Sequence, residues 1–193
     1  MKTTAIILAA GFSRRFGREK LMMHLHGKPI AAHVIDAVLG AGFIETILVY
    51  RNEEISRLAE GKNIKCVYNP DSADGMSSSV KCGVRNSSPT DAFIFFAGDQ
   101  PYIDCDTINQ LITAFKTGKG TIVVPDYGGR KGSPVIFSSE WKPQLEKLTG
   151  DAGGRSVILA NPEKVYPVSI SNLKAGMDID TWEDYISHKP DKV

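Results

Sequence analysis

The sequence has little net charge, few cysteines and no long apolar run. Its 193 residues carry 23 Lys and Arg against 22 Asp and Glu, so it lacks the positive excess that holds a nucleic-acid backbone. Its three cysteines form neither a CxxC pair nor an even disulfide set, and we expect them to be reduced. No stretch approaches the roughly 18 apolar residues of a membrane span, and the apolar run Ala5–Ala10 is shorter than a signal-peptide core. These absences predict a cytoplasmic, soluble protein without nucleic-acid or membrane partners.

What the chain does contain is material for one core. Hydrophobic residues make up 42% of it, which is enough for a folded domain of this length. We find no repeat, low-complexity tract or linker. The chain is therefore expected to form a single domain over residues 1–193.

Short apolar runs rich in branched residues alternate with segments of helical spacing. Runs that are apolar on both faces predict buried strands, which belong to a sheet covered by helices. The alternation predicts an α/β fold: a single-domain, three-layer α/β/α Rossmann-like arrangement with a mainly parallel sheet. The expected strands are 4–8, 46–50, 64–68, 92–97, 121–124, 133–137 and 165–168, and the expected helices are 29–39, 76–84, 105–115, 140–148, 154–159 and 181–188.

Three residues refine these boundaries. Pro29 suits the first position of its helix, where a missing N–H costs nothing. Asp104 is expected to cap the helix that follows it. Pro134 lies inside the run 133–137, which favours either the edge of the sheet or the first position of a strand.

The loop after the first strand, residues 8–20, reads LAAGFSRRFGREK. A strand that ends in small residues and a glycine lets backbone N–H groups approach an anion closely, and parallel sheets place ligands beyond the carboxyl ends of their strands. A P-loop and a GxGxxG turn are both excluded, because Arg18 follows Gly17 and Ser13 stands where a second glycine is required. The loop therefore predicts a phosphate site; the alternative is a solvated basic loop.

The same loop resembles the LAAG-x-S-x-R-x-G-x-x-K signature of nucleotidyltransferases that activate sugars or cofactors. It is most similar to that of the molybdenum cofactor cytidylyltransferase family, which are MobA-like NTP transferases of the nucleotide-diphospho-sugar transferase superfamily. Four further segments keep the resemblance in order along essentially the whole chain: NPDSADGMSSSV (69–80), GDQP (98–101), GDAGGR (150–155) and MDIDTWED (177–184). The resemblance implies a Mg²⁺-dependent transfer of CMP from CTP to the phosphate of a molybdopterin-type cofactor, with release of pyrophosphate. A molybdenum hydroxylase would receive the product.

Such a transfer brings anionic groups together, so fixed cations and Mg²⁺ carry most of the catalysis. By the resemblance, Arg15 binds the β- and γ-phosphates, Lys20 binds the α-phosphate, and Asp99 holds Mg²⁺. Asp178 is the expected second metal ligand, with Asp180 as the alternative; Asp180 is otherwise a cap for the last helix.

Segment 75–80 opens a helix whose free N–H groups and hydroxyls can bind an anion, cap the helix or contact a base. Related cytidylyltransferases use this segment around the pyrimidine, and one of the serines at 77–79 is expected to be a plain N-cap. LAAG in place of LAGG, together with GDQP, favours CTP over GTP. The expected nucleotide-binding residues are Leu8, Ala9, Ala10, Gly11, Arg15, Lys20, Gly75, Met76, Ser77, Ser79 and Asp99.

Segments 128–134 and 150–155 are expected to face the acceptor. Family members often have Gly-His-Pro where this chain has Gly132-Ser133-Pro134, so the identity of the acceptor is the least constrained part of the interpretation. Arg155 pairs either with an acceptor phosphate or with Asp151. The expected acceptor-binding residues are Gln100, Pro101, Gly132, Ser133, Pro134, Asp151 and Arg155.

Three other functions fit the same residues less well. One is guanylyl transfer to the same cofactor, and another is cytidylyl transfer to a sugar or polyol phosphate. The third is a non-catalytic protein that binds a nucleotide or delivers the cofactor, but the chain retains both the cations and the carboxylates that catalysis requires.

Overall fold

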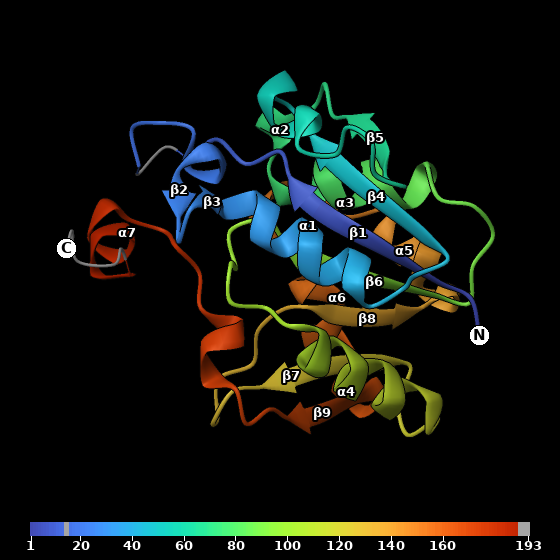
Figure 1. Cartoon of the computed structure of the whole chain (residues 1–193). Helices are drawn as coiled ribbons and strands as arrows, with labels where there is room; N and C mark the ends of the chain where they lie inside the picture. The colour runs from blue at the N-terminus through green and yellow to red at the C-terminus, as the bar shows by residue number, and fades with distance from the viewer. Residues whose placement is uncertain (14–15, 189–193) are drawn as a thin grey trace.

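The structure, a computed structural model, describes residues 1–13 and 16–188. Its centre is a seven-stranded sheet of order β5-β4-β1-β6-β8-β7-β9 (Figure 1). All neighbouring strands are parallel except β8, which runs antiparallel to both β6 and β7. The strands are β1 (Thr3–Ala9), β4 (Glu45–Tyr50), β5 (Lys65–Tyr68), β6 (Ala92–Ala97), β7 (Ile122–Asp126), β8 (Val135–Ser138) and β9 (Val165–Ser169), and β2 (His24–Leu25) with β3 (Lys28–Pro29) forms a separate hairpin.

Helices cover both faces of this sheet, and each face has its own hydrophobic core. The helices are α1 (Ile30–Gly40), α2 (Glu53–Arg57), α3 (Met76–Arg85), α4 (Cys105–Lys116), α5 (Lys142–Leu145), α6 (Arg155–Ala160) and α7 (Trp182–His188). One core joins Ile7 of β1 to buried residues of α1 and α4, and the other joins Ile6 of β1 to buried residues of α3, α5 and α6. Neighbouring residues of a strand point to opposite faces, so the chain forms three layers. The predicted α/β/α fold with a mainly parallel sheet is confirmed.

Of the predictions about helix ends, one is confirmed and two are wrong in detail. Asp104 does cap α4, because its side chain accepts a hydrogen bond from the Thr107 N–H at 2.7 Å. Pro29 is not the first helical residue: its extended ψ of 144° makes it the N-cap of α1, and it pairs with His24 in the β2–β3 hairpin. The predicted helix 140–148 is shorter, with a 3₁₀ turn at Ser139–Trp141 followed by α5.

The sheet-edge alternative for the strand near Pro134 is wrong. Strand β8 begins at Val135, directly after the proline, and lies inside the sheet between β6 and β7. Pro134 lies outside the strand, so its missing N–H removes no hydrogen bond from the ladder. The other alternative, a proline at the first position of the strand, is wrong by one residue, because Pro134 immediately precedes the strand.

The carboxyl ends of β1 and β6 lie side by side, because Leu8 pairs with Ala97 at the end of the parallel register. The loops that leave these two strands therefore begin at the same edge of the sheet. In the part of the chain that the structure describes, no helix is long and apolar enough to cross a membrane.

Candidate functional site

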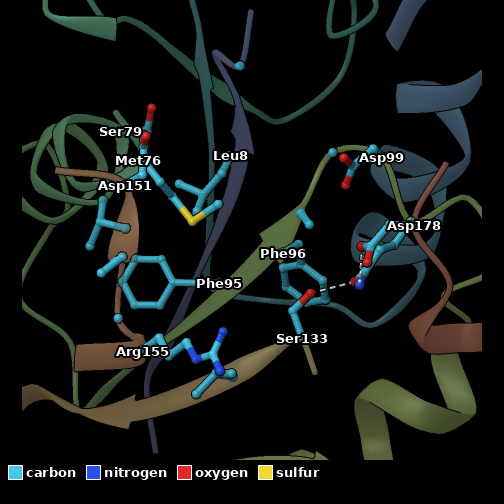
Figure 2. A pocket seen from close by; sticks show the side chains of 18 of the residues that line it. Leu8, Met76, Ser79, Phe95, Phe96, Asp99, Ser133, Asp151, Arg155 and Asp178 are labelled. Carbon is cyan, nitrogen blue, oxygen red and sulfur yellow. Dashed lines mark hydrogen bonds between the residues drawn. The ribbon is translucent and has the colours of Figure 1, made fainter. Parts of the chain in front are cut away.

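A cleft of about 960 Å³ opens at this edge of the sheet. Figure 2 shows Asp99, Asp178 and Ser133 at one end of it and Met76, Asp151 and Arg155 at the other, with Phe95 and Phe96 between them. Its volume lies at the upper end of the range for small-molecule sites, so the cleft has room for a nucleotide beside a second substrate.

At one end of the cleft a lysine lies between two carboxylates. The Nζ of Lys20 is 2.7 Å from Asp99 Oδ2 and 3.1 Å from Asp180 Oδ1, and Lys20 is only 7% exposed. Burial lowers the pKa of Lys20, but the charges and hydrogen bonds of Asp99 and Asp180 outweigh it and raise that pKa above its usual value. The ammonium is therefore held charged, where it can neutralise a phosphate.

The backbone brings these distant residues together. Lys20 opens a 3₁₀ turn at the end of the loop after β1, and Asp99 follows β6 directly. The Ile179 N–H donates to the Asp99 carbonyl at 3.0 Å, which holds the segment 178–180 against the end of β6. Three parts of the chain thus supply one charged cluster.

Asp178 lies beside this cluster in a hydrogen-bonded chain. Gln100 Nε2 donates to Asp178 Oδ1 at 2.8 Å, and Ser133 Oγ donates to Gln100 Oε1 at 2.5 Å (Figure 2). Desolvation by the surrounding protein raises the pKa of Asp178, and the nearby charge of Asp99 raises it further. A cation at this place would relieve the repulsion between the two carboxylates.

Asp180 does not cap α7. Asp184 Oδ2 accepts hydrogen bonds from the N–H groups of Thr181 and Asp180, at 2.8 and 3.0 Å, and Thr181 Oγ1 accepts one from the Asp184 N–H at 3.1 Å. This reciprocal capping leaves the Asp180 carboxylate to Lys20, so the capping alternative is wrong.

The predicted base segment has a different cap from the one expected. Gly75, with φ of 90°, is the N-cap of α3, so none of the serines at 77–79 takes that place. The Oγ of Ser78 donates to the Gly75 carbonyl at 2.8 Å, and Asn69 Nδ2 donates to Ser78 and Ser79 at 2.9 and 3.1 Å. Ser78 is thus held by its own helix and by Asn69, and Ser79 is held by Asn69.

Gly75 also lies tightly under the turn Gly150–Ala152. A Cβ at Gly75 would come within 2.8 Å of the Gly150 carbonyl oxygen, and the positive φ disfavours any side chain. The glycine therefore allows segments 69–80 and 150–155, which both resemble family motifs, to pack together at the same end of the cleft.

Most of the predicted site residues line this one cleft. They are Leu8, Ala10, Gly11, Lys20, Gly75, Met76, Ser79, Asp99, Gln100, Gly132, Ser133, Asp151, Arg155, Asp178 and Asp180.

Four other predicted residues, Ala9, Ser77, Pro101 and Pro134, are buried and are not among the residues that line the cleft. Ala9 belongs to the core on the opposite face of the sheet, because strand residues alternate between faces. Arg15 lies outside the described residues. Among those that are described, Arg155 and Asp151 are not joined by an ion pair.

We did not predict the apolar wall of the cleft from the sequence. It includes Phe95, Phe137 and Ile158. The alternation along β6 was a usable signal for Phe95, because Phe93 and Phe95 share a face two residues apart. Phe137 and Ile158 come from β8 and α6, so no local pattern could place them beside Phe95.

The carboxylates at the Asp99 end of the cleft are the residues that could hold a metal. Within residues 1–13 and 16–188 no group of three or more His, Cys, Asp and Glu is arranged as a metal site. Mg²⁺ needs no such group, since it is usually held by one or two carboxylates with substrate phosphates and waters. The oxygen donors of Asp99 and Asp178 therefore fit Mg²⁺.

The chain is similar to known proteins of one family. Residues 5–165 match the model of the MobA-like NTP transferase domain. The chain is 29% identical over 186 residues to the molybdenum cofactor cytidylyltransferase of Escherichia coli, covering 95% of this chain and 94% of that protein. It is 30% identical over 149 residues to a probable molybdenum cofactor guanylyltransferase of Thermococcus sibiricus, covering 74% of each.

A solved structure agrees at the level of the fold. A nucleotidyl transferase from Methanothermobacter superposes with a TM-score of 0.81 at 23% identity, covering 96% of this chain and 95% of that one. The chain is a nucleotidyltransferase and belongs to the MobA-like NTP transferase family.

Proposed function

We propose that this nucleotidyltransferase transfers CMP from CTP to the phosphate of a molybdopterin-type cofactor and releases pyrophosphate. The observation that carries the proposal is the charged cluster at one end of the cleft, where Lys20 Nζ lies 2.7 Å from Asp99. A fixed cation beside carboxylates that fit Mg²⁺ is what phosphoryl chemistry at a nucleoside triphosphate requires. The proposal treats residues 1–193 as one catalytic domain.

The chain's own residues would divide the work as follows. Lys20 turns its ammonium to the α-phosphate and stabilises the charge that builds there. Asp99 and Asp178 would hold Mg²⁺, with Asp180 as the alternative second ligand. When bound, the metal would neutralise the phosphate oxygens and orient the triphosphate. Arg15 is proposed to bind the β- and γ-phosphates.

The nucleotide would lie along the segments that end β1 and begin α3. Ala10 and Gly11 line one side of the cleft, and Gly75, Met76 and Ser79 line the other. Small residues on both sides allow backbone groups to approach a base. The likeness to the E. coli cytidylyltransferase over 95% of the chain supports CTP. The Thermococcus relative makes guanylyl transfer the second candidate.

The acceptor would lie beside the nucleotide, towards Arg155 and Asp151, which Figure 2 shows at the same end of the cleft as Met76. Phe95 forms an apolar wall there, which suits a flat ring system, and the exposed Arg155 guanidinium suits an acceptor phosphate. Cytidylyl transfer to a sugar or polyol phosphate remains the alternative for this end. We keep the expectation of a cytoplasmic enzyme whose product passes to a molybdenum hydroxylase.

The experiment is pyrophosphate release from CTP, GTP, ATP and UTP, each with Mg²⁺ and either molybdopterin-type cofactor or a sugar phosphate. We expect CTP with the molybdenum cofactor to give the fastest release, and Asp99→Asn to lower kcat by about 100-fold or more because a charged ligand is lost. Faster pyrophosphate release with GTP would identify GTP, in place of CTP, as the nucleotide substrate. Release only with a sugar phosphate would identify that compound as the acceptor in place of the cofactor. No release in any combination would contradict the proposal.

A further inference from the structure

Arg51 lies outside the cleft, yet it contacts both ends of the loop that follows β1. It comes directly after β4, and its Nε donates to the Gly11 carbonyl at 3.1 Å. Its Nη2 donates to Glu19 Oε2 at 2.8 Å. Its guanidinium also lies 4.5 Å from the centre of the Phe12 ring. One side chain thus joins the first residues of the loop to its last.

The position of Arg51 is itself fixed by the turn it belongs to. Asn52 donates from Nδ2 to the same Glu19 oxygen at 3.3 Å, and its Oδ1 accepts from the Glu54 N–H at the start of α2. The Arg51 and Glu19 side chains are only 23% and 15% exposed, so water screens their attraction less than it screens a surface pair.

We propose that Arg51 and Glu19 form a clasp that holds the two described ends of the loop after β1, at Gly11 and Phe12 and at Glu19, in the positions that receive the triphosphate, with Arg51 as a positioning residue. The inference rests on the proposed function, in which this loop binds the phosphates of the nucleotide. Loop ends that are already held in place lose less entropy when the ligand binds, and this raises affinity without any new contact to the ligand.

Charge gives a second reason for the clasp. Glu19 is the one acidic residue of the loop and would repel a triphosphate. Pairing with Arg51 offsets this negative charge where it arises, so that Glu19 repels the phosphates less.

The clasp requires arginine rather than any cation. Its planar group donates in two directions at once, to the Gly11 carbonyl and to the Glu19 carboxylate. A lysine has one ammonium on a flexible stem and cannot reproduce this fork together with the contact over the Phe12 ring.

The test compares Arg51→Met, Arg51→Lys and Glu19→Gln with wild type, by calorimetric binding of CTP and of GTP and by the KM and kcat of pyrophosphate release. We expect Arg51→Met to raise the Kd and KM for the triphosphate about tenfold or more, the effect of losing hydrogen bonds to a charged group. We expect kcat to change less, since Arg51 is not among the residues that line the cleft. Arg51→Lys should restore the Kd and KM only partly, to values between those of Arg51→Met and wild type.

The double variant Arg51→Met with Glu19→Gln should bind no worse than Arg51→Met alone, because the two residues act as a pair. Lys28→Met is the matched control. It removes a lysine that pairs with Asp36 at 2.5 Å on the surface and does not line the cleft, so its Kd should equal that of wild type.

The outcomes separate the clasp from the proposed function. Wild type that neither binds nor turns over any triphosphate contradicts the proposed function and removes the basis of the clasp. If wild type binds and turns over the triphosphate, and Arg51→Met and Arg51→Lys have the same Kd and KM as wild type, the clasp is wrong and the proposed function stands. A fall in kcat at unchanged Kd in these variants and in Glu19→Gln overturns it as well.

Discussion

Among single residues, Gln100 decides where the Asp178 carboxylate points. It is 4% exposed and bridges Ser133 and Asp178 with hydrogen bonds from both ends of its amide. Partners of this kind hold a metal-binding carboxylate in one orientation, and their loss typically costs about 10–100-fold in metal affinity or activity. We expect Gln100→Leu to lower kcat within that range and to weaken Mn²⁺ binding, measured by titration calorimetry. Ser133→Ala should have a smaller effect in the same direction.

The sequence led us to expect Gln100 and Ser133 at the acceptor instead, and the same variants distinguish the two roles. A raised KM for the acceptor with unchanged Mn²⁺ binding would contradict the positioning role. Ser56→Ala is the matched control, because that hydroxyl hydrogen-bonds to Glu53 of its own helix and does not line the cleft. It should leave kcat, the KM for the acceptor and Mn²⁺ binding unchanged.

Some of the residues at this site could be predicted from the sequence, and others could not. Lys20 and Asp99 could be named because each lies in a short segment that resembles a family motif, and Asp99 also follows a predicted strand directly. The chain from Ser133 to Asp178 could not, because Gln100 lies 33 residues from Ser133 and 78 from Asp178. Arg51 was missed for the same reason, since it lies 40 residues from Gly11 in the sequence.

Among the elements, α4 shows what one capping residue contributes. Asp104 accepts hydrogen bonds from the Thr107 N–H at 2.7 Å and from Asn172 Nδ2 at 2.6 Å. Burial raises the pKa of Asp104, but these hydrogen bonds outweigh it, and the pKa lies below its usual value. Asp104→Ala should lower the free energy of unfolding by about 1 kcal/mol at pH 7, measured by urea unfolding.

The pH dependence of that difference follows from the sign of the shift. Because the pKa is lower in the folded protein, the stabilisation is present above the unfolded value of about 3.9 and is lost as the pH falls through the folded value. The gap between wild type and Asp104→Ala should therefore narrow below about pH 4. A gap that stays constant down to pH 2 would count against the charged cap. Asp104→Asn, which keeps an acceptor but no charge, should show little pH dependence relative to Asp104→Ala.

The sheet shows which elements can be predicted from sequence and which need the whole fold. Strands β1, β4 and β6 are apolar on both faces, so the pattern alone indicates their burial. The place of β8 follows no such pattern, because its central position depends on antiparallel pairing with both β6 and β7. Only the packed sheet determines that pairing, and β8 then brings Phe137 to the cleft.

At the scale of the whole molecule, the first and last parts of the chain meet at the charged end of the cleft. Lys20 and Asp180 are 160 residues apart and lie in direct contact. Helix α7 packs against the same loop, with the Phe16 ring centre 5.6 Å from that of Trp182 and 5.9 Å from that of Tyr185. Figure 1 shows α7 beside the β2–β3 hairpin, where the Tyr185 hydroxyl donates to the His24 carbonyl at 2.8 Å.

This closure explains how a chain with a net charge of +1 can bind a polyanion. The binding would depend on where the charges lie. Lys20 presents one fixed ammonium at an end of the cleft, and the carboxylates beside it would attract Mg²⁺, whose charge offsets that of the phosphates. The low net charge argues against non-specific binding of nucleic acid, but it carries no information about a local phosphate site.

The central claim is that the cleft joins a cytidine nucleotide to a molybdopterin-type cofactor. The most direct measurement is mass spectrometry of the product after incubation of the whole chain with CTP, Mg²⁺ and that cofactor. The account predicts a product heavier than the cofactor by one CMP unit, formed together with an equal amount of pyrophosphate. Cofactor that stays unmodified with CTP, while GTP or another acceptor yields the adduct, would contradict it.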